Sequence, residues 1–115
     1  MTTQQGETSR LSESVSRFIR SVERRDTTEV LRMIASASRH AIAPGRLAQL
    51  FFDNTKDFQE RGGIRAIKVH HEESDGKNAA VDIEMTYGDG TTERETIDLR
   101  MEGEAWKIDV AVVQE

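Results

Sequence analysis

The stretch AAVDIEMTYGDGTTERETIDLRMEGEAWKIDVAVV, residues 79–113, alternates apolar and polar side chains in three segments separated by short polar turns. The apolar positions are Val81, Ile83, Met85 and Tyr87, then Ile97, Leu99 and Met101, and finally Trp106, Ile108, Val110 and Val112. Successive side chains of a β-strand point to opposite faces, so this period of two gives each strand one apolar face and one charged face. We therefore expect an antiparallel sheet with one covered side and one side in water.

A fourth strand is expected just before this stretch. It starts at Ile64, with Ile67 and Val69 facing inward and Lys68 and His70 facing outward. Turn signals separate all four strands. Glycine next to aspartate or asparagine is such a signal, because this pair favours tight hairpin turns. These signals are Asp75-Gly76, Gly88-Asp89-Gly90 and the weaker Gly103. The four strands are therefore predicted to follow one another as a meander.

Three helical segments are predicted ahead of the sheet. The first begins near Ser12, and spacings of three and four residues place five apolar side chains on one stripe, namely Leu11, Val15, Phe18, Ile19 and Val22. Asp26, Thr27 or Thr28 is expected to cap a short second helix. Pro44 suits the first turn of a third helix, which Gly62-Gly63 should end.

These elements predict an α+β fold, with three N-terminal helices packed on one face of a curved four-stranded antiparallel sheet. With 115 residues, 36% of them hydrophobic, the chain suits a single small domain. We expect that domain to cover residues 12–113. Residues 1–11 are almost entirely polar and are expected to be frayed or disordered.

Composition excludes several classes of function. The chain has no cysteine, which rules out disulfides and thiolate metal sites, and no apolar run long enough to span a membrane. Residues 1–60 carry nine Lys and Arg against eight Asp and Glu, whereas residues 61–115 carry seven against thirteen. An acidic sheet half argues against nucleic-acid binding. We expect a cytoplasmic protein as the sequence stands, or an envelope or secreted protein if a leader was trimmed.

The order of elements resembles the cone-shaped fold of nuclear transport factor 2-like proteins, also called cystatin-like. Within that superfamily the chain is most similar to a bacterial family of uncharacterised domains often found in lipoproteins. The resemblance rests on Val15 to Ile19, Gly63-Ile64, the Tyr87 to Gly90 turn and Gly103 to Ile108. It implies a cavity between helices and sheet, pairing of two copies through the sheet, and either isomerase-like or non-catalytic roles. Fold alone does not choose among these roles.

An isomerase or cyclase of this kind would need a carboxylate base and a hydrogen-bond donor inside the cavity. Tyr87, the only tyrosine, is predicted to face inward, with Asp53 on the third helix as a candidate carboxylate. The strand carboxylates of Asp82, Glu84, Asp98 and Asp109 are predicted to face water, so no catalytic residue is assigned. An inward carboxylate within hydrogen-bond reach of Tyr87 in a cavity would favour the enzyme.

No metal or cofactor is expected. His70 and His71 are adjacent, so on a regular strand they would face opposite ways and could not share an ion. His40 lies outside any predicted element, and the chain has no glycine-rich phosphate loop.

Large apolar side chains either fill the core or line a cavity for a small apolar ligand. The candidate lining residues are Phe18, Phe51, Phe58, Met85, Tyr87, Leu99 and Trp106. The first hypothesis is a non-enzymatic binding or accessory domain that acts through a protein partner or a small apolar ligand. The alternatives are an isomerase- or cyclase-like enzyme using Tyr87 and a helix carboxylate, and a structural homodimer whose sheet faces meet.

Overall fold

The structure is a computed structural model that describes residues 2–36 and 44–109, with their side chains except at positions 2–9, 44, 45, 47, 48, 50, 51 and 54. Helices α1 (Thr2–Glu23), α2 (Thr27–Met33) and α4 (Pro44–Glu60) come first in the chain. Strands β1 (Ile64–Ser74), β2 (Asn78–Tyr87), β3 (Thr92–Glu102) and β4 (Ala105–Ile108) follow. The strands pair antiparallel in the order β1-β2-β3-β4, which confirms the predicted meander and the α+β class.

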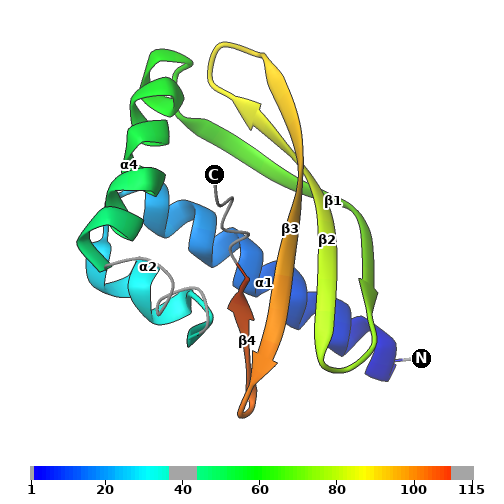
Figure 1. The fold of residues 1–115 in the computed structure, drawn as a ribbon. Coiled ribbons are helices and arrows are strands. Elements are labelled where there is room, and N and C mark those ends of the chain that lie inside the picture. The colour runs from blue at the N-terminus through cyan, green and yellow to red at the C-terminus, as the bar shows by residue number, and fades with distance from the viewer. Residues whose placement is uncertain (1, 37–43, 110–115) are drawn as a thin grey trace, which may run out of the picture.

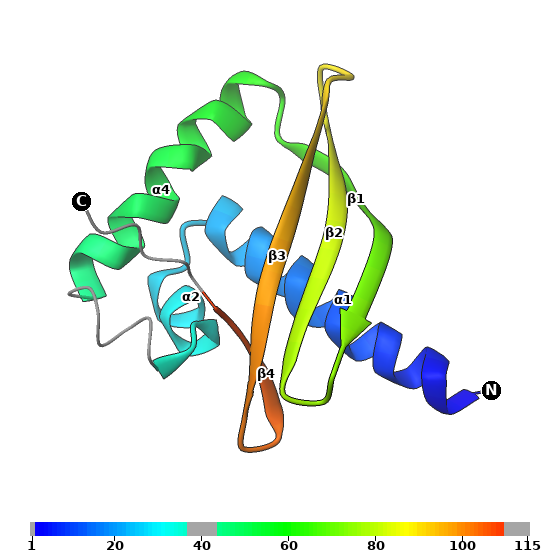
Figure 2. The same ribbon diagram turned by 45° about the vertical axis from the view of Figure 1, so that its right-hand side comes forward.

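The helices lie on one side of the twisted sheet, with α1 crossing its face and α2 and α4 beside it (Figure 1, Figure 2). Helix α4 packs against α1 and α2. The core forms where α1 meets the sheet: Val15 of α1 and Val81, Ile83 and Tyr87 of β2 have no exposed surface. Burial of such apolar side chains is the main favourable term in folding. The predicted inward face of β2 is therefore confirmed.

Two helix starts can be compared with their predictions. Helix α2 begins as predicted, because the Asp26 carboxylate accepts a hydrogen bond from the Glu29 N–H at 3.2 Å. Helix α1 instead starts at Thr2, ten residues before Ser12. Extending an existing helix adds one hydrogen bond per residue, and no proline stops it here. The expectation that residues 1–11 fray in solution stays a prediction.

Beyond α2 the chain reaches the sheet edge. Ile34 forms a parallel bridge with Ile108, and the Ala35 N–H donates to the Ile108 carbonyl at 2.8 Å. This contact covers part of the exposed edge of β4, which is where unpaired backbone groups would otherwise face water. The predicted strand positions Val110 and Val112 lie outside the described residues.

The outer face of the sheet carries paired charges. His70 Nε2 lies 2.6 Å from Glu84 Oε1, Arg94 pairs with Asp82, and Arg100 lies 3.7 Å from Asp109. The hydrogen bond from His70 holds the pKa of Glu84 below its ordinary value. The register of β2 with β1 and β3 places Asp82 and Glu84 on this outer face, as predicted, and Asp109 pairs there with Arg100.

Strand β1 contains two irregularities that the alternation did not reveal. The second lies between Val69 and His71, where the pairing with β2 shifts by one residue. A bulge of this kind reverses the inside–outside parity of all later residues. His70 and His71 therefore both face outward, so the prediction that they point opposite ways is wrong. The same shift turns Glu72 inward, opposite Val81 and beneath α1.

The turn that follows α4 and the turn between β2 and β3 are hydrogen-bonded to each other. The Gly88 N–H donates to the Gly63 carbonyl at 2.8 Å, and the Asp89 N–H donates to the Arg61 carbonyl at 2.9 Å. A Cβ at Gly88 would lie only 2.3 Å from the Gly62 carbonyl oxygen, so only glycine permits this approach. Gly62 and Gly63 also have φ values of 88° and 79°, which favour glycine.

Candidate functional site

A small pocket opens between the helices and the inner sheet face, with a volume of about 120 Å³. Helix α1 contributes three apolar side chains, α4 contributes Phe58, and β2 and β3 supply the floor. The lining residues are Phe18, Ile19, Val22, Phe58, Ile83, Met85, Glu95 and Ile97. Seven of these eight side chains are apolar, so the pocket offers a largely hydrophobic surface with one carboxylate.

Glu95 stands at the rim of the pocket. It remains exposed to solvent on one side and lines the pocket on the other. Burial of part of the side chain among apolar neighbours raises the pKa of Glu95, and the nearby Glu93 carboxylate raises it further. No described residue forms a hydrogen bond or an ion pair with Glu95. The rim therefore carries a carboxylate that ionises less readily than an ordinary glutamate.

Tyr87 belongs to a separate cluster beside the pocket. Its hydroxyl donates to Glu93 Oε1 at 2.8 Å, and its ring packs 5.9 Å from the ring of Phe58. The Arg61 guanidinium lies 3.9 Å above the same ring and 3.6 Å from Glu93 Oε1. Burial first, and then the hydrogen bond to Glu93, raise the pKa of Tyr87 well above its ordinary value. Tyr87 is thus a neutral donor whose partners are all within the chain.

An enzyme would need one carboxylate that both lines the pocket and lies within hydrogen-bond reach of Tyr87. Here two glutamates each meet only one of these two requirements. Glu93 is within hydrogen-bond reach of Tyr87, but it is partly exposed, is paired with Arg61 and does not line the pocket. Glu95 lines the pocket but forms no hydrogen bond with the Tyr87 hydroxyl, which donates to Glu93. The other candidate carboxylate, Asp53, is exposed and accepts a hydrogen bond from the side-chain amide of Gln49 at 2.7 Å.

The predicted lining residues are distributed over several places. Phe18, Phe58 and Met85 line the pocket, whereas Tyr87 and Leu99 are buried in the core beside it. The side chain of Phe51 lies outside the described residues.

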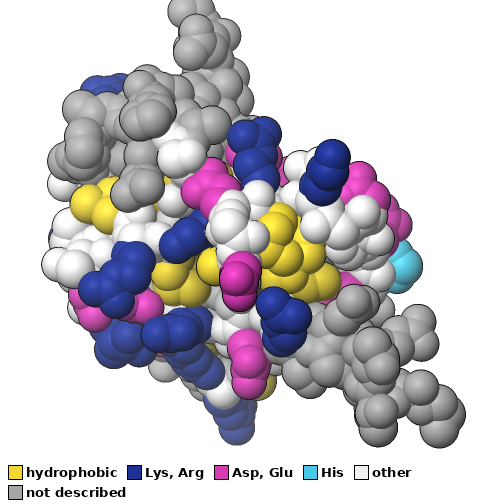
Figure 3. Space-filling model, turned by 90° about the horizontal axis from the view of Figure 1, so that it is seen from below, with side chains coloured by type: hydrophobic (Ala, Val, Ile, Leu, Met, Phe, Trp, Pro, Cys, Tyr) yellow, Lys and Arg dark blue, Asp and Glu magenta, His cyan; other side chains and the backbone are white. Residues whose placement is uncertain are grey.

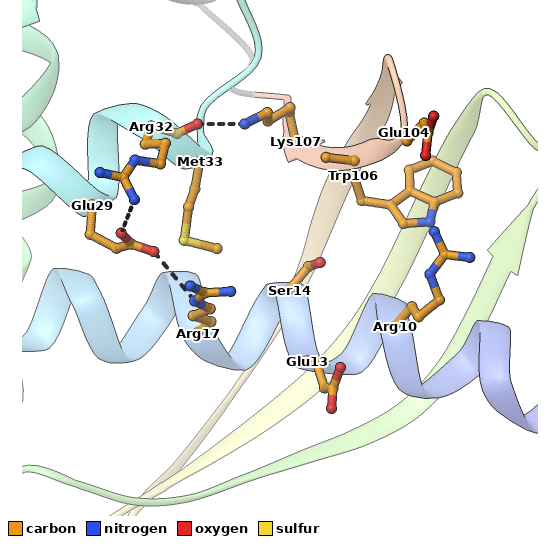
Figure 4. A pocket seen from close by; sticks show the side chains of 11 residues that line it. Arg10, Glu13, Ser14, Arg17, Glu29, Arg32, Met33, Glu104, Trp106 and Lys107 are labelled. Atoms are coloured by element: carbon orange, nitrogen blue, oxygen red, sulfur yellow. Dashed lines mark hydrogen bonds and ion pairs between the residues drawn. The ribbon is translucent and has the colours of Figure 1, made fainter.

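Trp106 lines a different hollow, a groove of about 310 Å³ between α1, α2 and β4. Seen from below Figure 1, the surface mixes basic and acidic side chains around smaller hydrophobic areas (Figure 3). Within the groove, Glu29 pairs with both Arg17 and Arg32 at 3.3 Å, and Lys107 Nζ donates to the Arg32 carbonyl at 2.8 Å (Figure 4). Three of the seven charged side chains that line the groove, Arg17, Glu29 and Arg32, are therefore paired with one another.

Glu93 and Glu95 were not singled out from the sequence, although a signal for them was present. The predicted strand that carries Ile97, Leu99 and Met101 was expected to begin at Ile97, whereas the corresponding strand β3 begins at Thr92. Ile97 and Leu99 face inward, and counting back by twos from Ile97 gives Glu95 and Glu93. Their cross-strand partners Ile83 and Met85 confirm that both lie on the inner face.

Two further features concern the described ranges 2–36 and 44–109, namely metal-binding clusters and membrane-spanning helices. No group of three or more His, Asp or Glu side chains there could hold a metal ion. None of the helices there is both long and apolar enough to span a membrane. His40 lies outside the described residues.

Comparison with solved structures identifies the fold. A Campylobacter jejuni protein provisionally described as an NTF2-like transpeptidase superposes with a TM-score of 0.75 at 13% identity, covering 87% of this chain and 97% of its own. A SEC-C motif containing protein from Rhodopseudomonas palustris superposes with a TM-score of 0.52 at 11% identity, covering 83% and 71%. No family model matches the sequence, and no curated protein matches it. The chain therefore has a nuclear transport factor 2-like fold, and at these identities the likeness shows the fold alone.

Proposed function

We propose that this chain is a non-enzymatic binding domain that takes a small, mainly apolar ligand into the pocket between α1, α4, β2 and β3. The observation that carries this proposal is a hollow lined by seven apolar side chains at the place where helices and sheet meet. Ligand sites in proteins are usually concave, mostly apolar and fitted with a few polar groups, and Glu95 supplies the polar group here.

The size of the pocket limits the ligand. A molecule of liquid water occupies about 30 Å³, so 120 Å³ has room for about four non-hydrogen atoms. A larger ligand would have to leave part of itself in solvent at the rim, where Glu95 is exposed.

Titration with isobutanol tests the proposal. We expect the methyl resonances of Ile83 and Ile97, in ¹³C-labelled protein, to shift and saturate as isobutanol enters. The variant Ile97→Phe should fill the pocket and abolish these shifts at Ile83. Met101 lies on β3 outside the lining, so Met101→Leu serves as a control that should bind as the wild type does. Methyl shifts that are unchanged at saturating isobutanol would refute the proposal.

A second candidate function is acid–base catalysis by Glu95. The specific observation that favours it is the raised pKa of this carboxylate beside an apolar pocket, which is how enzymes obtain a general base near neutral pH. Such a base would exchange the protons next to the carbonyl of a small ketone. We expect no acceleration of hydrogen–deuterium exchange in cyclopentanone over buffer. An acceleration that Glu95→Gln removes would establish the enzyme instead.

We further propose a relationship to the bacterial family of domains often found in lipoproteins. Supporting this proposal, Gly63-Ile64 and the Tyr87 to Gly90 turn, two of the motifs that suggested it, are the two turns joined by backbone hydrogen bonds. The same proposal gives the compartment of this protein, because domains of that family act in the cell envelope when a leader precedes them. Fractionation of cells carrying the native gene, with antibody detection in cytosolic and envelope fractions, tests this point.

A further inference from the structure

Within the part of the chain that the structure describes, the Glu95 carboxylate at the rim of the pocket has no ion-pair partner. Every described side chain that α1, α4 and β2 contribute to the lining is apolar, and Glu95 of β3 is the one charged group among the lining residues. Glu93, two residues earlier on the same face of β3, adds a second negative charge nearby.

Arg61 is the cation beside these glutamates, and it already forms ion pairs with Glu93 and Asp57. Arg61 Nη1 lies 3.6 Å from Glu93 Oε1 and 3.5 Å from Asp57 Oδ2, and its guanidinium covers the ring of Tyr87. At the end of α1, Arg20 pairs with Glu23 at 3.0 Å and donates to the Ile64 carbonyl. None of the described cations forms an ion pair with Glu95. Among the described residues, the Glu95 carboxylate therefore has no cationic partner.

We infer, as an extension of the proposed function and resting on it, that the ligand is a small organic cation, an alkylammonium whose apolar body enters the pocket and whose charge meets Glu95. The rings of Phe18 and Phe58 line the same pocket, and aromatic faces attract cations. The rim carboxylate gains most from such a ligand, because a hydrogen bond to a charged group in a partly apolar setting is stronger than a neutral one.

Three probes of one shape and different charge test this inference. Isobutylammonium, isobutanol and isobutyrate share a branched apolar body and carry positive, zero and negative charge. We expect isobutylammonium to bind about two- to thirtyfold more tightly than isobutanol, because a hydrogen bond to a charged group exceeds a neutral one by about 0.5–2 kcal/mol. Isobutyrate should bind most weakly. The readout is the dissociation constant from the methyl shifts of Ile83 and Ile97.

Variants of one strand assign the effect to Glu95. In Glu95→Gln the preference for isobutylammonium over isobutanol should disappear. Asp98→Asn removes one negative charge from the exposed outer face of the same strand and should keep the preference. Glu95→Lys should reverse the order, so that isobutyrate binds best. Both Glu95 variants change a side chain at the solvent-exposed rim, and the methyl spectrum of the free protein verifies that each is folded.

The outcomes separate this inference from the proposed function. Equal binding of all three probes would overturn the cationic ligand and leave the apolar pocket supported. Binding of none would refute both. A preference for isobutylammonium that persists in Glu95→Gln would also overturn the inference, since the charge would then be met elsewhere.

Discussion

Tyr87 offers the cleanest measurement at the scale of single residues, because it is the chain's only tyrosine. Burial and the hydrogen bond to Glu93 raise the pKa of its hydroxyl. The folded-state pKa lies above that of the unfolded chain, about 10, so Tyr87 contributes stability below that pH and loses it as the pH rises further. Ultraviolet titration should therefore show no tyrosinate near pH 10 until the protein unfolds. A reversible midpoint near 10 in folded protein would contradict the buried hydroxyl.

Glu72 of β1 lies on the inner face of the sheet, opposite Val81. Both carboxylate oxygens are inaccessible to solvent and complete no hydrogen bond with a described group. Burial raises the pKa of Glu72, and the Ser12 hydroxyl beside it offsets part of the rise. Because the folded-state pKa is raised, stability falls as pH rises from about 4.5 through the folded-state value. Glu72→Gln should then increase the free energy of unfolding by on the order of 1 kcal/mol at pH 7.

The neighbouring residue makes a matched control for this prediction. Glu73 is exposed and lies 3.2 Å from His71 on the outer face, so Glu73→Gln should change the free energy of unfolding by less than about 0.5 kcal/mol. Urea titrations at pH 7 and pH 4 compare the two variants. The gain from Glu72→Gln should shrink at pH 4, where the wild-type carboxyl is already protonated. An equal gain at both pH values would show that ionisation of Glu72 is not the cause.

At the scale of elements, the contact between the two turns decides how α4 meets the sheet. Gly88→Ala would place a Cβ against the Gly62 carbonyl, and steric overlap of this kind in packed regions costs about 1–3 kcal/mol. Gly76→Ala is the comparison, because Gly76 has open space around it and only a positive φ of 95° to maintain. Thermal unfolding should place Gly88→Ala below Gly76→Ala in stability. The opposite order would mean that the turns do not touch in solution.

The elements also show why sequence patterns found the fold and only part of the site. Strand β2 alternates without interruption, so its inner face could be predicted residue by residue. Strand β1 could not, because nothing in its composition marks the bulge that turns Glu72 inward. Glu93 and Glu95 were overlooked for another reason: charged residues weaken a strand pattern, although their parity with Ile97 places them inside. A pocket forms from side chains of four elements, and its volume depends on packing that periodicity does not describe.

For the whole molecule, the outer sheet face bears on the alternative of a homodimer. Its charges are already paired within one chain, as in His70 with Glu84, Arg94 with Asp82, and Arg100 with Asp109. The centres of protein interfaces are usually depleted of charge, so this face is poorly suited to a second copy. Sedimentation at physiological salt should therefore give the mass of a single chain. A dimer that Arg94→Glu dissociates would instead establish pairing through the sheet.

The proposed ligand site requires a small apolar pocket between α1, α4, β2 and β3. A crystal structure determined under xenon pressure tests it most directly, because xenon enters apolar cavities of this size without needing a specific partner. We predict xenon density among Phe18, Phe58 and Ile97 in the wild-type protein, and none in Ile97→Phe. Wild-type crystals in which these side chains touch one another and no xenon lies between them would contradict the account.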